Sequence, residues 1–141
     1  MGAQLLRFAA SFGVTAMRFP DRSPNTRKAL AMAEHARDEG RLHPFRRAAM
    51  DAHWLRGEDL EAREVLASCA AAAGLDPEKA LAAMEEPSLR ARVDAMGRDA
   101  ARAGVTGIPT FLIGERRVVG CQPYEVLRAT AETAGATHRF T

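Results

Sequence analysis

The chain has 141 residues and a formal net charge of +2, with 47% hydrophobic and 27% charged residues. This length fits one domain, and the composition excludes disordered, collagen-like and coiled-coil proteins. Of the 20 basic residues, 18 are arginines, and they are spread over the whole chain with acidic residues between them. Since a nucleic-acid binder usually gathers its basic residues on one stripe, no nucleic-acid partner is expected.

The sequence predicts a cytoplasmic protein without a membrane contact. No apolar stretch approaches the ~20 residues that a spanning helix needs, and the first ten residues lack the pattern of a signal peptide. Cys69 and Cys121 are too far apart to form a Cys-x-x-Cys pair, and two cysteines are too few for a disulfide framework. Both thiols are expected to be reduced. The histidines show no spacing typical of metal ligands, so neither a metal nor another cofactor is expected.

Hydrophobic spacing predicts a mostly helical chain up to Gly104. A first helix is expected over residues 4–12, followed by Gly13 as its stop and by an extended segment over residues 14–19. Caps, glycines and prolines then divide the next eighty residues into five helices. Asn25 caps the first of these helices in this interpretation, Pro87 ends the fourth, and Ser88 caps the fifth. The expected ranges are 25–40, 43–57, 59–73, 76–87 and 88–104.

Two further expectations concern the last of these helices and the region that follows it. Gly97 lies inside the apolar pattern of the helix, and because glycine weakens a helix it predicts close packing of another element there. The β-rich residues 110–113 and 116–119, separated by Gly114 and Glu115, predict a tight hairpin. A final helix is expected to start at Gln122–Pro123, and the tail over residues 135–141 is expected to be weakly ordered.

The carboxyl-terminal segment carries a family resemblance. It reads Gly-Val-Thr-Gly-Ile-Pro-Thr-Phe-Leu-Ile over residues 104–113, and continues with a turn, a strand, Gly-x-Gln-Pro and a helix. This order resembles the carboxyl-terminal half of the DsbA-like thioredoxin-fold proteins. The five helices before it are similar in position and length to the helical insertion of that family, and Pro24-Asn25-Thr26 resembles the opening of that insertion in cytoplasmic members.

The resemblance implies an α/β fold, thioredoxin-like (DsbA-like) with a helical insertion. The fold would be mostly helical in this chain, with a carboxyl-terminal β-hairpin and helix. It also implies one incomplete domain over residues 1–141, with the insertion over residues 25–104 and the thioredoxin-fold segment over residues 105–134. The implied activity is thiol–disulfide oxidoreduction on a protein or peptide substrate. Because the sequence contains no Cys-x-x-Cys, which holds the family's nucleophile, no catalytic residue is assigned and the chain is expected to be catalytically incomplete.

The candidate substrate-binding residues are Gly107, Ile108 and Pro109. By resemblance the Ile108–Pro109 peptide bond is cis, and an extended peptide pairs as a strand with the exposed backbone of Ile108. Gly107 would leave room for close approach. Cys121 is a candidate redox thiol, although a small buried hydrophobic residue is the favoured interpretation because no activating group is evident beside it. Cys69 is expected in the core.

Two alternatives remain open. One is a glutathione-dependent isomerase or transferase of the 2-hydroxychromene-2-carboxylate isomerase type. Such enzymes often carry Phe-Trp-Gly-x-Asp-Arg after the hairpin, whereas this chain has Val-Gly-Cys-Gln-Pro over residues 119–123. The other is a non-catalytic interaction module. Because an unpaired strand edge is a template for association, this alternative predicts that the hairpin edge or the Ile108 backbone pairs with a partner or makes the chain a homodimer.

Overall fold

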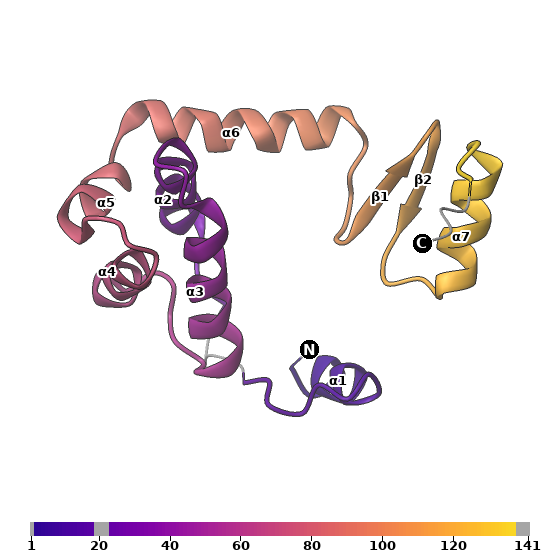
Figure 1. Ribbon diagram of the computed structural model, residues 1–141, viewed down its shortest axis with the longest axis horizontal. Helices are drawn as coiled ribbons and strands as arrows, with labels where there is room; N and C mark the ends of the chain where they lie inside the picture. Colours follow the sequence, from indigo (N-terminus) through magenta and orange to yellow (C-terminus); the bar gives the residue numbers. More distant parts are fainter. Residues whose placement is uncertain (1, 19–22, 138–141) are drawn as a thin grey trace. The chain divides into compact units, whose positions relative to one another are not determined.

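The computed structural model describes residues 2–18 and 23–137 of the chain. Within these ranges Figure 1 shows helices along most of the chain and a two-stranded sheet near its carboxyl end. The chain forms two compact units, unit 1 over Met1–Met96 and unit 2 over Gly97–Thr141. The elements are α1 (Gly2–Ala10), α2 (Arg27–Asp38), α3 (Leu42–Leu55), α4 (Arg63–Ala72), α5 (Pro77–Ala83), α6 (Pro87–Arg102), β1 (Thr110–Ile113), β2 (Arg116–Val119) and α7 (Tyr124–Thr133).

The core of unit 1 is formed by α2, α3, α4 and α5, which pack on one another. Its largest fully buried side chains are Phe45, Met32, Leu66 and Met84. Most other members of the cluster are alanines that recur at helical spacing, such as Ala49 and Ala52 on α3. Because alanine adds little volume, these helices approach one another closely and the few large side chains fill the remaining space. We call this cluster the α2–α5 core.

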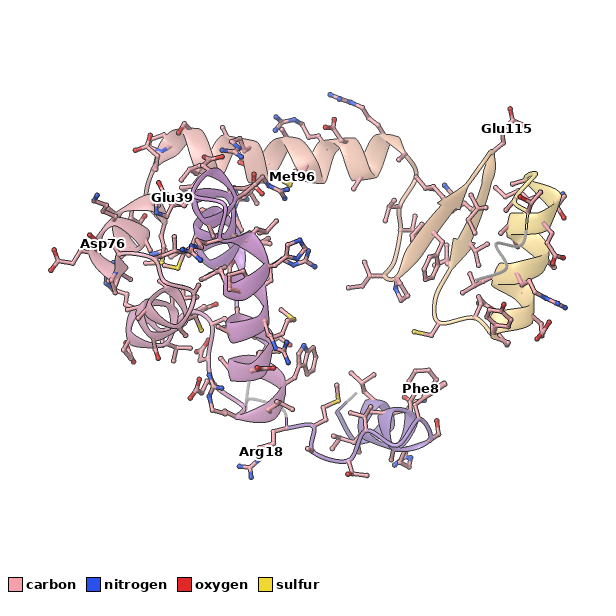
Figure 2. All side chains as sticks on the ribbon, in the orientation of Figure 1. Phe8, Arg18, Glu39, Asp76, Met96 and Glu115 are labelled. Atoms are coloured by element: carbon pink, nitrogen blue, oxygen red, sulfur yellow. The ribbon has the colours of Figure 1, made fainter. Side chains whose placement is uncertain are left out.

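Local capping explains where several helices begin and end. Asp76 lies at the start of α5 (Figure 2), and its carboxylate accepts hydrogen bonds from the backbone N–H groups of Glu78 (2.9 Å) and Lys79 (3.3 Å). This is the predicted cap, followed by a proline in the first turn. Gly74 ends the preceding helix with φ +75°, and the Leu75 N–H bonds back to the Ala70 carbonyl (2.9 Å), as the sequence predicts.

Two predicted helix starts are wrong because side chains stabilise turns ahead of the helices. α2 begins at Arg27 rather than Asn25, and the Asn25 side chain accepts the Arg27 N–H (3.2 Å) from outside the helix. The next shift is larger, since α4 begins at Arg63 and not at Asp59. The Asp59 carboxylate accepts the N–H of Glu61 (2.9 Å), which holds residues 59–61 in a turn. The expected extended segment over residues 14–19 is neither helix nor strand as far as residue 18, and its last residue lies outside the described ranges.

The start of α6 and the environment of Gly97 also differ from expectation. Pro87 opens α6 instead of ending the helix before it, since the first turn of a helix needs no N–H donor from that position. Ser88 does not cap the helix, because it lies inside the first turn, where its hydroxyl donates to the Glu86 carboxylate (3.1 Å). The prediction of close packing at Gly97 is wrong, since a Cβ built there meets no atom within 4 Å. Along the apolar stripe of α6, Leu89 is buried and Met96 is 45% exposed.

Ion pairs tie the first half of α6 to α2. Glu34 on α2 is 5% exposed, and its carboxylate accepts hydrogen bonds from Arg92 (2.6 Å) and Arg37 (3.1 Å). A second bond from Arg92 reaches Asp38 (2.7 Å) and lowers the pKa of that carboxyl. Arg27 likewise pairs with Asp94. A buried carboxylate is tolerated in a protein when it is paired and hydrogen-bonded in this way.

Unit 2 contains the predicted hairpin and the last helix. β1 and β2 pair antiparallel at the predicted residues, with Thr110 opposite Val119 and Ile113 opposite Arg116. Glu115 lies at the tip (Figure 2), after Gly114 with φ +58°, as a two-residue hairpin turn requires. None of the described residues in 97–137 is buried, so unit 2 has no enclosed core of its own. None of the helices in the described part of the chain is both long and apolar enough to cross a lipid bilayer.

Candidate functional site

The candidate residues Gly107, Ile108 and Pro109 form the loop that leads into β1. Within this loop the Ile108–Pro109 peptide bond is cis, and the side chain of Ile108 is 91% exposed. The Thr110 hydroxyl donates to the Gly107 carbonyl (2.6 Å) and so closes the loop at the first residue of the strand. On the other side the Gly120 N–H donates to the Pro109 carbonyl (2.7 Å). The loop is therefore fixed to the hairpin at both ends.

The hydrogen bond between Gly120 and Pro109 continues the β1–β2 ladder by one pair beyond the two strands. In an antiparallel ladder, hydrogen-bonded pairs alternate with pairs whose backbone groups point outward. Phe111 and Ile113 therefore bond to the partner strand, whereas the N–H and C=O groups of Thr110 and Leu112 face the free edge of β1. In the described part of the chain, the N–H and C=O of Ile108 have no hydrogen-bond partner either. The loop and the strand together present one unpaired backbone edge.

Packing within the chain does not require the glycine at position 107. Gly107 has no positive φ, and a Cβ built on it would lie 3.6 Å from the nearest Val119 side-chain carbon, an ordinary van der Waals contact. Gly104, at the start of the same segment, differs in both respects. It has φ +69°, its carbonyl accepts a hydrogen bond from the Arg117 guanidinium (2.7 Å), and a Cβ there would collide with that group.

The two cysteines lie in contrasting environments. Cys69 is 2% exposed in the α2–α5 core, as predicted, and burial raises the pKa of its thiol. Cys121 is exposed, so the favoured interpretation of it as a small buried residue is wrong. It follows Gly120, whose N–H bonds to Pro109, and therefore lies at the same end of the hairpin as Ile108.

The sequence did not reveal several groups that shape the site. The Gly120 N–H bonds to the Pro109 carbonyl, and the Arg117 guanidinium bonds to the Gly104 carbonyl ahead of the loop, contacts that the folded hairpin brings together. The bond from the Thr110 hydroxyl to Gly107 is local, since it spans three residues. The bond between Gly120 and Pro109 could have been predicted from the register of the hairpin, because that register places residue 120 beside residue 109. Among the residues that the structure describes, no group of three or more histidine, cysteine, aspartate or glutamate side chains is placed to hold a metal ion.

Comparisons with known proteins concern the fold of the chain. The family model for DSBA-like thioredoxin domains matches residues 1–131. A crystal structure described as that of a probable DsbA oxidoreductase from Streptomyces coelicolor is 30% identical in sequence, covers 99% of this chain and superposes with a TM-score of 0.78. The predicted DsbA-like thioredoxin fold, with its helical part followed by a hairpin and a helix, is thereby confirmed. No curated protein matches the chain. The chain spans 61% of the length of the Streptomyces protein.

Proposed function

Because this chain belongs to the family of DSBA-like thioredoxin domains, we propose that it forms the peptide-binding part of a thiol–disulfide oxidoreductase. The observation that carries the proposal is the unpaired backbone of Ile108 at the free edge of β1. A peptide in extended conformation gains main-chain hydrogen bonds by adding to such an edge. Gly107 also supports the proposal. Neither its backbone angle nor its neighbours in the chain require a glycine at this position, whereas a peptide that approaches the backbone closely would require one.

These 141 residues are catalytically incomplete in this proposal. Thiol–disulfide exchange proceeds through a mixed disulfide, which a second thiol must then resolve. The sequence has no Cys-x-x-Cys. Exposed Cys121 can attack a substrate disulfide, with the substrate sulfur leaving as a thiolate, but buried Cys69 is shielded from the resulting mixed disulfide. We therefore expect binding without turnover, and the cytoplasm, where both thiols stay reduced, is the proposed location.

Two measurements test the proposal. In an insulin-reduction assay with dithiothreitol, the isolated chain should not exceed the background rate, and a clear acceleration would contradict catalytic incompleteness. In an NMR titration with an extended, cysteine-free peptide, the amide resonances of Ile108 and Thr110 should shift. Ile108→Pro removes the N–H donor and should abolish this binding, whereas Ile108→Ala keeps the backbone and should bind like the wild type because the side chain is 91% exposed.

The same protein samples also serve to test the alternative function, a glutathione-dependent isomerase or transferase. We expect no heat of binding when glutathione is titrated into the protein, because the segment after β2 lacks the residues typical of that enzyme class. Saturable glutathione binding would favour the isomerase or transferase interpretation. If Ile108→Pro bound the peptide as tightly as the wild type, the edge would not be the binding site and the proposal would fail.

A further inference from the structure

The free edge of β1 has neither a charge nor an outward-facing proline to prevent it from pairing with another strand. Residues 105–114 contain no charged side chain. Pro109 does not blunt the edge, because its carbonyl faces β2 and accepts the Gly120 N–H. The outward backbone groups of the strand belong to Thr110 and Leu112, and Leu112 is 58% exposed. An edge of this kind is a template for association.

The positions of these outward groups define how a second β1 can pair with the first. A twofold axis perpendicular to the sheet at Phe111 places Thr110 of each copy opposite Leu112 of the other. In an antiparallel ladder such a pair exchanges two N–H to C=O bonds, so the two pairs supply four bonds between the copies. An axis at Thr110 or at Leu112 would instead pair that residue with itself and give half as many bonds within the strands.

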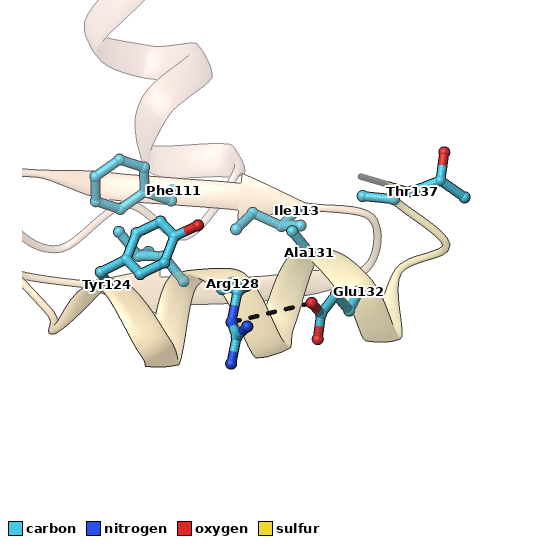
Figure 3. A pocket seen from close by; sticks show the side chains of 9 residues that line it. Phe111, Ile113, Tyr124, Arg128, Ala131, Glu132 and Thr137 are labelled. Carbon is cyan, nitrogen blue, oxygen red and sulfur yellow. Dashed lines mark ion pairs between the residues drawn. The ribbon is translucent and has the colours of Figure 1, made fainter. Parts of the chain in front are cut away.

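The side chains are compatible with the axis at Phe111. Figure 3 shows Phe111 and Ile113 on the face of β1 toward α7. Phe111 is 37% exposed, and the axis places it directly opposite the same residue of the second copy. Cross-strand aromatic pairs stabilise a sheet. The nearest charged residue, Glu115, comes opposite Gly107 of the second copy, so no like charges meet.

Pairing would also supply what unit 2 lacks. Its sheet has two strands, none of the described residues in 97–137 is buried, and a hairpin of this kind is marginally stable in water. Two hairpins joined through β1 form a sheet of four strands. Each hairpin is about 10 Å wide, which matches the diameter of one helix, so the α7 helices of both copies fit side by side on one face.

We propose that a second copy of this chain pairs with the free edge of β1 in this register and thereby keeps the edge from binding a peptide. The inference rests on the proposed function for the identity of the competitor, whereas the pairing itself does not. An isologous contact of this kind closes on itself and yields a dimer rather than a filament. Because the strand is short and supplies few bonds, an excess of extended peptide should displace the second copy.

Light scattering coupled to size exclusion, with the full chain in reducing buffer across micromolar concentrations, tests the pairing. The wild type should be a dimer. Leu112→Pro removes one outward N–H from each copy and should weaken the dimer roughly tenfold or more, while the bonds of Phe111 and Ile113 to β2 remain. Leu112→Ala is the matched control, because it keeps the N–H and should stay a dimer. Circular dichroism separates loss of the dimer from loss of folding. A monomeric wild type, or a dimer that Leu112→Pro leaves intact, would overturn the proposal.

Disulfide trapping tests the register without a proline. Thr110→Cys and Leu112→Cys are each made in a Cys121→Ser background, and Cys69 is buried. Paired residues of this kind have Cα atoms about 5.5 Å apart, within the range of a disulfide. Under mild oxidation a mixture of the two variants should cross-link much faster than either variant alone. Faster cross-linking of one variant with itself would contradict the axis at Phe111.

The cysteine-free extended peptide separates this inference from the proposed function. Added in excess to the wild type, it should lower the measured mass to that of a monomer while the Ile108 amide resonance shifts. If the chain is monomeric before the peptide is added and the amide still shifts, the dimer is refuted and the proposed function stands. If a dimer shows no change in mass or in amide resonances, the proposed function is contradicted and the pairing stands. A peptide that shifts the amide while the dimer persists would place the dimer contact elsewhere and overturn the inference.

Discussion

The strongest test of the α2–α5 core is the replacement of Phe45 by alanine. Phe45 is 1% exposed and is the aromatic side chain among the buried residues described in this core. A buried phenylalanine removes 150–250 Å² from water, which at about 25 cal/mol per Å² is worth roughly 4 to 6 kcal/mol as an upper bound. Measured replacements of this kind cost about 3 to 5 kcal/mol. Because half of the buried residues described in this core are alanines, which cannot extend into the cavity, we expect about 4 kcal/mol.

Urea unfolding followed by far-ultraviolet circular dichroism measures this change in the free energy of unfolding. Met50→Ala is the matched control, because Met50 is on the same helix and 48% exposed, and it should change stability by about 0.5 kcal/mol or less. If Phe45→Ala cost no more than Met50→Ala, the large side chains would not hold the alanine-rich helices together and the packing argument would be refuted.

Four further predictions concern the α5 cap, the two thiols and the Asp38 carboxyl. Asp76→Ala should lower the free energy of unfolding by about 1 kcal/mol by removing the α5 cap, whereas Asp76→Ser should retain most of it in the same urea assay. A thiol reagent should label Cys121 rapidly and Cys69 only upon unfolding. Since burial raises the pKa of Cys69 above its unfolded value of 9.0, stability should fall as the pH rises beyond about 9, and less steeply in Cys69→Ala. The Arg92 hydrogen bond lowers the pKa of Asp38 below 3.8, so its contribution is present at neutral pH and is lost as the pH falls below about 5. Acid titrations of stability should be flatter for Asp38→Asn, and an unchanged slope would contradict this role.

The parts of the fold that the sequence predicted are those encoded by neighbouring residues. The hairpin, the cap at Asp76 and the helix end at Gly74 depend on contacts within a few positions, and the structure has them where expected. The starts of α2 and α4 shifted because Asn25 and Asp59 bond to backbone N–H groups in turns, which compete with a helix for the same side chains.

What the sequence could not show depends on distant partners. Apolar periodicity placed Met96 on the same face of α6 as Leu89. Periodicity alone cannot show that Leu89 is buried while Met96 stays exposed. Nor does the sequence mark Glu34 as buried, since its partner Arg92 is 58 positions away. In the candidate site, the family resemblance identified Ile108, while the unpaired edge that extends from it through Leu112 follows from the strand register.

Every buried residue in the described part of the chain lies before position 90, which has a consequence for how the chain unfolds. Amide protons in the helices around Phe45 should exchange with solvent through global unfolding, whereas those of the hairpin and α7 should exchange through local opening at a much lower free energy. A protease should therefore cut first in unit 2. Any ligand or partner that engages this region would first be detected as slower exchange of the hairpin amides, because binding stabilises the closed form by mass action.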